Sequence, residues 1–212
     1  MTISHHPSDE TLAAFAAGNL DHGRHVVVAA HIELCSHCQV WQSALEHMAG
    51  AMLFDCPPVS LSVGAFGRTL AQLDAPEVTA MQLDEIHRTE ALPSALRGQL
   101  LGKWSWIGRG IHHRPVGPTA ETGARVFMLK VDPGIQLPNH THTGTEFTLV
   151  LSGAFSHAGG RFGPGDIEEA DDQVEHVPVV DAGEACICLV AMDGKLKLLG
   201  SMGRMLQPFV RF

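Results

Sequence analysis

The sequence predicts an α+β protein of two domains, a small helical bundle followed by a small β-barrel of the jelly-roll type. Up to about residue 75, apolar residues recur at three- and four-residue spacing, which is typical of amphipathic helices. From residue 93 onward, short apolar or alternating runs are separated by glycine and proline, which is typical of many short strands. The expected ranges are 1–75 for the helical domain, 76–92 for a linker and 93–212 for the β domain, and each domain should bury a modest core of its own.

Four helices are expected in the first domain. Ser8 is a suitable N-cap for the first helix, and Asp21 is one for the second. Pro57 and Pro58 end the third helix, because proline cannot continue a helix. The expected helices run from Ser8 to Gly18, from Asp21 to about Cys35, from Val40 to Leu53 and from about Ser62 to Asp74.

The second domain begins with a short helix and continues with strands. The helix is expected around Ser94–Leu101. Period-two alternation and short apolar runs then predict the strands. These strands span Trp104–Ile107, Ile111–Val116, Val126–Val131, Phe147–Leu151, Ala185–Met192 and Phe209–Phe212.

Charge and composition exclude some classes of function. The chain carries 14 basic against 23 acidic residues, a net charge of −9, whereas nucleic-acid binding needs clustered lysine and arginine. Residues 1–75 contain seven acidic residues and only two arginines. The resulting negative charge of this region would attract a basic protein partner. The sequence has no apolar run of about 18 residues and no start like a signal peptide, which favours a cytoplasmic protein.

A candidate metal site lies near the N-terminus. His31, Cys35 and Cys38 form the pattern HxxxCxxC, in which the first two share a helix face and Cys38 follows just past the helix end. A closed zinc site needs four nitrogen or sulfur ligands, and either His5 or His6 can supply the fourth. Zinc would then staple a bundle whose core is small. The alternative is that the two cysteines are small buried apolar residues and that His31 is an ordinary helix residue.

The residues around this pattern argue against haem and offer no further ligands. Gln39 stands where the haem motif CxxCH needs a histidine, and His37 and Cys56 are read as bystanders. An odd number of cysteines, five, favours metal or redox chemistry over a disulfide framework. The pattern resembles the zinc-binding anti-sigma domain over about residues 1–75, and this resemblance implies His6 as the fourth ligand.

A second candidate metal site lies in the β domain. The pattern GxxxxxHxHxxxExxxxxxG occurs at Gly134, His140, His142, Glu146 and Gly153. Histidines two residues apart on a strand point to the same face, and the glutamate can add a carboxylate after the intervening turn. The pattern resembles the first motif of the cupin family.

The resemblance to cupins extends to a second motif. Gly165 and Asp166 begin it, and its histidine is His176, which the resemblance implies as the fourth ligand. Asp171 and Gln173 replace the proline and glycine that are usual before that histidine, so the turn there is expected to differ. Three imidazoles and one carboxylate suit zinc, iron, manganese, nickel or copper. The alternative is a set of histidines paired with the glutamate and water, without a metal.

Two further cysteines lie in an expected strand of the β domain. Cys186 and Cys188 are two residues apart, so both thiols point to one face. Packing in the core is the ordinary role of such residues. The sharper hypothesis is that both face the barrel interior near the metal and make the protein responsive to oxidants.

The two motifs in this order resemble the ChrR-type anti-sigma factors. The MTIxHH start and the Leu-Gln-Pro-Phe stretch at 206–209 belong to the same resemblance. It implies a cytoplasmic regulator, not an enzyme, whose helical domain binds an extracytoplasmic-function sigma factor and keeps it from RNA polymerase. It also implies that the cupin domain takes part in releasing the sigma factor under singlet oxygen or organic hydroperoxides. A homodimer through the cupin sheets is a further expectation.

An apolar surface for this partner is predicted on the first and fourth helices. These helices carry more apolar surface than so small a bundle can bury. The candidate contact residues are Leu12, Phe15, Phe66, Leu70 and Leu73. The alternative is that they form the core of the bundle.

Two other functions compete with this interpretation. One is a metal-dependent cupin enzyme, a dioxygenase or isomerase, with an accessory helical domain. The other is a sensor of metal availability. Stable complex formation with a sigma factor distinguishes the regulator from the enzyme, and dependence of that complex on the cupin metal identifies the sensor.

Overall fold

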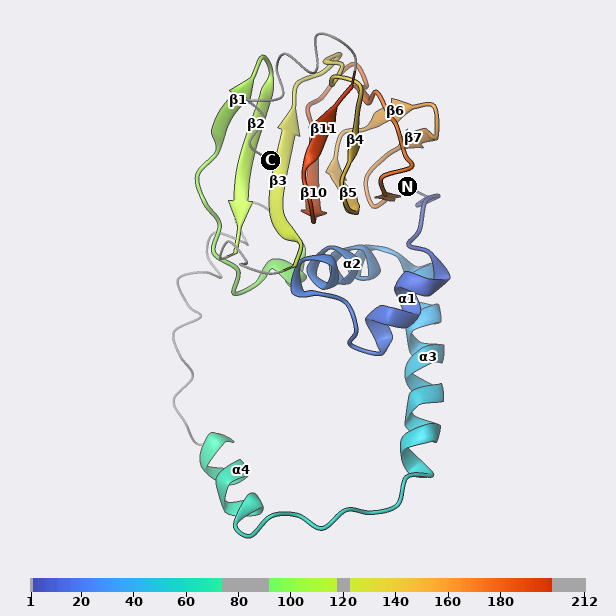
Figure 1. Ribbon diagram of the computed structural model, residues 1–212, viewed down its shortest axis with the longest axis vertical. Helices are drawn as coiled ribbons and strands as arrows, with labels where there is room; N and C mark the ends of the chain where they lie inside the picture. The colour runs from blue at the N-terminus through green and yellow to red at the C-terminus, as the bar shows by residue number, and fades with distance from the viewer. Residues whose placement is uncertain (1, 74–91, 118–122, 200–212) are drawn as a thin grey trace.

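The computed structural model describes residues 2–73, 92–117 and 123–199. Helices occupy the first of these ranges and strands the other two, as the sequence predicts (Figure 1). The helices are α1 (Asp9–Ala16), α2 (His22–Leu34), α3 (Ser36–Phe54) and α4 (Ala65–Leu73), and a short 3-10 helix, η1 (Ser94–Leu96), precedes the strands. Ser8 and Asp21 cap α1 and α2 through their side chains, as predicted.

The strands form three sheets around a common interior. The six-stranded sheet has the order β1-β2-β3-β10-β5-β8, and two smaller sheets, β11-β4 and β7-β6-β9, complete the domain. All pairs of neighbouring strands are antiparallel. The strands are β1 (Ser105–Gly108), β2 (Ile111–Val116), β3 (Arg125–Val131), β4 (His140–His142), β5 (Glu146–Ser152), β6 (Phe155–His157), β7 (Gly160–Phe162), β8 (Ile167–Ala170), β9 (Val179–Val180), β10 (Cys186–Met192) and β11 (Leu196–Leu198).

Helix α2 lies directly against the six-stranded sheet (Figure 1). Val27 and Val28 are fully buried and belong to the same apolar cluster as Leu149 of β5 and Leu189 of β10. The expectation that each domain buries a core of its own is therefore wrong for the helical domain. The reason is that α2 is apolar around most of its circumference, so one helix face packs on α1 and α3 while another packs on the sheet.

Strand β10 is buried on both faces because of this packing. Cys186, Cys188 and Val190 point into the barrel interior, whereas Leu189 and Ala191 point toward α2. The alternation follows the two-residue period of a strand. It explains why the sequence of β10 is an almost continuous apolar run.

Helices α3 and α4 extend away from the β domain. Figure 1 shows the far end of α3 and all of α4 standing apart from the sheets. The prediction that four helices form one bundle is wrong for α4, because no residue of this helix is buried; the observed bundle consists of α1, α2 and α3. None of the helices among the described residues combines the length and apolar character needed to cross a membrane.

Several sequence predictions differ in detail from the structure. The helix expected at Ser94–Leu101 is only the three-residue η1, and six strands, β4, β6, β7, β8, β9 and β11, were not predicted because each has only two to four residues. The predicted linker at 76–92, except for its last residue, and the predicted strand Phe209–Phe212 lie outside the described residues, as does the 206–209 stretch.

Candidate metal centres

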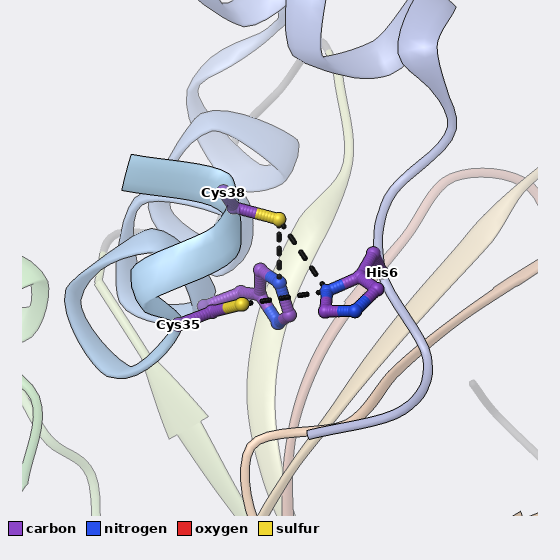
Figure 2. Close-up of side chains that lie close together, drawn as sticks. His6, Cys35 and Cys38 are labelled. Atoms are coloured by element: carbon purple, nitrogen blue, oxygen red, sulfur yellow. Dashed lines mark hydrogen bonds between the residues drawn. The ribbon is translucent and has the colours of Figure 1, made fainter. Parts of the chain in front are cut away.

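The N-terminal candidate site brings four side chains together. Potential ligand atoms of His6, His31, Cys35 and Cys38 all lie within 4.8 Å of one another. Nδ1 of His6 lies 3.4 Å from Sγ of Cys35 and 3.5 Å from Sγ of Cys38, and Nε2 of His31 lies 3.2 Å from the Cys38 sulfur. Figure 2 shows His6 approaching the two cysteines from the N-terminal segment. The cluster joins the start of the chain to the junction of α2 and α3.

His31 is fixed in the orientation that a metal ligand needs. Its Nδ1 lies 2.8 Å from the carbonyl oxygen of Gly165, and because a carbonyl can only accept, Nδ1 carries the proton. Nε2, which faces the Cys38 sulfur, is then free of hydrogen when the ring is neutral. Burial lowers the pKa of His31 to about 4, so the ring is neutral near pH 7.

The two thiols fit a cation in the same place. Burial and the neighbouring Cys35 raise the pKa of the Cys38 thiol to about 12. A buried cation reverses this effect, because its charge stabilises thiolates and releases their protons. For tetrahedral zinc, bond lengths near 2.3 Å to sulfur and 2.0–2.1 Å to nitrogen place such ligand atoms about 3.5 Å apart. The observed nitrogen–sulfur distances of 3.2–3.5 Å match this spacing.

The neighbouring candidates fall outside this cluster. The ring of His5 packs on Phe162, with ring centroids 4.2 Å apart, and faces Asp166 rather than the sulfurs. His37 lies beside His6 without joining the four ligand groups, and Cys56 is exposed. The geometry thus favours His6 over His5.

The second candidate site lies inside the β domain. Ligand nitrogens of His140, His142 and His176 lie within 4.8 Å of one another, and all three residues are buried. His140 and His142 lie on β4 with both side chains inward, and the backbone of His176 pairs with that of His140 through hydrogen bonds of 3.1 and 3.2 Å. Two segments more than thirty residues apart thus supply one cluster.

The turn before His176 forms despite its unusual residues. The side chain of Asp171 accepts a hydrogen bond of 2.9 Å from the backbone N–H of Gln173, and the Asp171 carbonyl accepts one from Val174. An aspartate side chain that mimics a backbone turn in this way replaces the rigidity of a proline.

In two of these histidines, Nδ1 is engaged in a polar contact, which leaves Nε2 as the nitrogen that could bind a metal. Nδ1 of His140 donates to the carbonyl of Pro138 at 2.7 Å, and Nδ1 of His176 lies 3.2 Å from the carboxylate of Glu168. Among the described residues, Nε2 of His176 is buried without a hydrogen-bond partner. A buried polar atom without a partner is costly, and a metal ion would satisfy it.

Glu146 reaches this cluster through His142. Its carboxylate oxygen Oε2 lies 3.3 Å from Nε2 of His142, but it does not belong to the group of mutually close ligand atoms. Burial lowers the pKa of His142, but the carboxylate of Glu146 outweighs burial and the net shift is upward. The predicted carboxylate is thus beside the three imidazoles, paired with one of them.

Two residues that sequence reasoning missed support His176. Oε1 of Glu168 lies between Nε2 of His157, at 2.8 Å, and Nδ1 of His176, at 3.2 Å. His157, Glu168 and His176 also form a second group of close ligand atoms. Glu168 lies within the second motif, between Asp166 and His176, but at a position that the motif does not specify, and His157 lies outside both motifs.

The histidine cluster opens onto a cavity of about 400 Å³. Most of its wall is apolar, with Phe127, Leu129 and Phe155 among the lining residues, and His140 and Glu146 add polar groups. Cys186 and Cys188 line the same cavity, with sulfurs 3.6 Å apart, so the expectation that both thiols share one face and point inward is confirmed. The hydrogen bond with Cys186 and burial raise the pKa of the Cys188 thiol.

The predicted partner-contact residues separate into two groups. Leu12 is 2% exposed and Phe15 is half-buried against the core. Both side chains of α1 therefore pack against the core and offer a partner little surface. Phe66 and Leu73 of α4 are 75% and 77% exposed, and Leu70 is exposed on the same helix. Helix α3 also carries exposed apolar side chains, Met48, Met52 and Phe54.

Comparisons with known proteins identify the family of the chain. The family model of the ChrR cupin-like domain matches residues 102–195. The Anti-sigma-E factor ChrR of Cereibacter sphaeroides is 38% identical over 217 residues, which cover 100% of both chains. A chain in the crystal structure of Rhodobacter sphaeroides SigE in complex with the anti-sigma ChrR superimposes with a TM-score of 0.74 at 39% identity, over 91% of this chain and 100% of that one. On this full-length similarity of sequence and fold, the chain belongs to the ChrR family of anti-sigma factors.

Proposed function

We propose that this protein is an anti-sigma factor that binds an extracytoplasmic-function sigma factor and keeps it from RNA polymerase. The observation that carries the proposal is the similarity to the Anti-sigma-E factor ChrR over the whole of both chains. The matching solved structure holds its anti-sigma chain in complex with SigE. A protein with this role acts beside RNA polymerase, in the cytoplasm, and needs no catalysis, because sequestration requires only competition for a binding surface.

The N-terminal ligands support a structural zinc ion in this protein. His6, His31, Cys35 and Cys38 provide two nitrogen and two sulfur ligands, the donor set of a closed zinc site. The ion would join the N-terminal segment to α2 and α3, and so fix the direction in which α3 leaves the β domain. In the proposed organisation, the anti-sigma domain covers residues 1–75 and the cupin domain covers 93–212, joined by a linker at 76–92.

The exposed apolar faces of α3 and α4 support the partner surface. Phe66, Leu70 and Leu73 are exposed on a helix with no buried residue, and exposed apolar side chains gathered on one helix are typical of a protein interface. Acidic residues outnumber basic ones in residues 1–75, so this region is negatively charged. A basic region of the sigma factor would therefore be attracted to it.

The cupin centre supports the release step. His140, His142 and His176, with Glu146 beside them, would hold zinc or another divalent transition metal next to the cavity. An organic hydroperoxide that entered the cavity would oxidise the thiol of Cys186 or Cys188 to a sulfenic acid and leave as the alcohol. Singlet oxygen is the other proposed signal. Because the pKa of the Cys188 thiol is raised, this thiol reacts slowly unless a cation stabilises the thiolate.

Binding to a sigma factor tests the proposal directly. Full-length protein, purified without added metal, is titrated with the extracytoplasmic-function sigma factor of the same organism, and transcription by RNA polymerase holding that sigma factor is measured in parallel. We expect a stable complex and loss of transcription. Phe66→Asp with Leu70→Asp should weaken binding at least ~10-fold, because apolar anchors dominate interfaces. Leu100→Asp, at an exposed apolar residue of the other domain, is the matched control.

A protein that forms no complex and leaves transcription unchanged contradicts the proposal. The metal-dependent enzyme would then become the leading explanation of the cupin cavity.

A further inference from the structure

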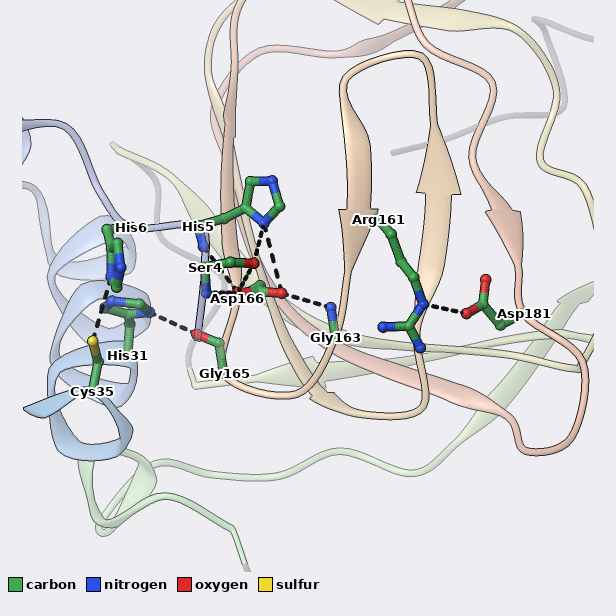
Figure 3. A network of polar contacts seen from close by, with 10 residues as sticks. All are labelled: Ser4, His5, His6, His31, Cys35, Arg161, Gly163, Gly165, Asp166 and Asp181. Carbon is green, nitrogen blue, oxygen red and sulfur yellow. Dashed lines mark hydrogen bonds and ion pairs between the residues drawn. The ribbon is translucent and has the colours of Figure 1, made fainter. Parts of the chain in front are cut away.

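A turn of the cupin domain lies directly behind the N-terminal metal cluster. The turn consists of residues 163–166, between β7 and β8, and it faces the segment from Ile3 to His6 (Figure 3). The two domains therefore also meet here, beside the N-terminal ligands, in addition to the contact of α2 with the sheet. We call these residues the Gly163–Asp166 turn.

Asp166 binds the N-terminal segment through its side chain. Its Oδ1 accepts hydrogen bonds from the backbone N–H groups of Ser4, at 2.7 Å, and His5, at 2.9 Å. Its Oδ2 accepts one from the N–H of Gly163, at 2.8 Å, which closes the turn itself. Burial raises the pKa of Asp166, but these three N–H donors outweigh burial and keep the pKa below its usual value. The side chain is thus a buried, ionised acceptor that ties residues 162 positions apart.

The backbone of the turn completes the connection. The carbonyl of Gly165 accepts the Nδ1 hydrogen bond of His31, and the N–H of Ile167 donates to the carbonyl of His5 at 3.3 Å. Gly165 has φ of +90°, and a Cβ there would lie 2.5 Å from the Ile3 side chain. The positive φ favours glycine at this position, and any larger residue would also have to displace the end of the Ile3 side chain.

We infer that the Gly163–Asp166 turn of the cupin domain positions two of the four N-terminal zinc ligands, with Asp166 as the positioning residue for His6. Asp166 fixes Ser4 and His5, the residues just before His6, and Gly165 fixes the ring of His31. The zinc site would then require both domains, although all four ligands belong to one of them. The inference rests on the proposed zinc site and gives a physical route by which the cupin domain reaches the partner-binding helices.

Cobalt absorption measures this effect at the N-terminal site alone. Full-length protein is loaded with Co²⁺, whose thiolate-to-metal charge-transfer band reports cysteine ligation, and its loss to excess EDTA is followed with time. Removing groups that orient metal ligands typically costs 10- to 100-fold in affinity. We expect Asp166→Ala to lose the band at least ~10-fold faster than the wild type and Asp166→Asn to fall between the two.

Asp181→Asn is the matched control. Asp181 is another aspartate of the β domain that binds a side chain, with Arg161 Nε at 2.7 Å, but it lies away from the N-terminal segment in Figure 3. The control should lose cobalt at the wild-type rate. Ser4→Pro removes the Ser4 N–H and hydroxyl without altering the turn, so it should also accelerate cobalt loss.

If Asp166→Ala fails to fold, as judged by near-UV circular dichroism, Ser4→Pro decides by the same measurement. Wild-type rates of cobalt loss in the folded variants overturn the inference. Sigma-factor binding is measured on the same samples, so a wild-type protein that binds cobalt through thiolates but no sigma factor contradicts the proposed function alone.

Discussion

The two candidate metal clusters differ in what surrounds them. The N-terminal cluster has two thiols and two imidazoles enclosed between helices, the N-terminal segment and the turn at Gly165. The cupin cluster has three imidazoles beside a carboxylate, and it opens onto a cavity of about 400 Å³. A metal with four protein ligands has no open coordination position, so its role is structural. A metal that faces a cavity can also bind a water or a small molecule that exchanges with solvent. If both clusters hold metal, the N-terminal one is suited to a structural ion and the cupin one to an ion that small molecules can reach.

The largest expected effect is the loss of the N-terminal ion. Cys35→Ser with Cys38→Ser removes both sulfur ligands, and structural zinc contributes ~10–16 kcal/mol in zinc-finger peptides. We expect one metal ion fewer per chain by elemental analysis and sigma-factor binding at least ~100-fold weaker by calorimetry. His140→Ala with His142→Ala, at the cupin cluster, should change binding without an oxidant by no more than about threefold, because the proposed release requires oxidation of the cavity thiols. Equal losses in both variants would erase the distinction between the clusters.

The next effect concerns the packing between the two regions. Leu189 of β10 is fully buried and packs toward α2. Leu189→Ala should therefore lower the free energy of unfolding by ~2–5 kcal/mol. Helix and barrel signals in urea denaturation should move together, since they share this cluster. Leu100→Ala, at a 62% exposed residue, should change stability by no more than ~0.5 kcal/mol. Two separate transitions would show that the domains do not share a core.

A smaller effect is expected from the support of the cupin cluster. Glu168→Gln removes the negative charge of the carboxylate whose Oε1 meets both His157 and His176. The affinity of the cupin site for its ion should fall ~10-fold, measured by chelator competition, while the N-terminal site is unchanged. Glu175→Gln, next to His176 but exposed, is the control. Unchanged affinity in Glu168→Gln would make Glu168 an ordinary buried acid.

The smallest effect tests the boundary of the N-terminal cluster. The ring of His37 lies 4.7 Å from that of His6, but His37 is not among the four close ligand groups. His37→Ala should keep the full metal content and change zinc affinity no more than about twofold. His6→Ala, the matched loss of a ligand, should release the ion. Loss of metal in His37→Ala would require a different fourth ligand.

The sequence predicted features that depend on neighbouring residues. The HxxxCxxC and HxH spacings place side chains together through helix and strand geometry, and the structure brings both groups together. His6 was indicated over His5 only by resemblance, because no local period connects it to His31. His157 and Glu168 were missed, since their pairing depends on where two short strands meet. The consecutive valines of α2 could have indicated a helix buried on more than one side.

The junction at Cys35 gives α3 a mechanical property. The helix has 19 residues and begins directly after that cysteine, so at 1.5 Å per residue it reaches about 28 Å from the metal-binding junction. A tilt of about 10° at its base would move the far end by about 5 Å, roughly the width of a side chain. A small change in the ligand cluster would therefore be magnified along α3. A rotation too small to unfold the cluster would still displace the exposed far end of the helix and weaken the binding of a partner there.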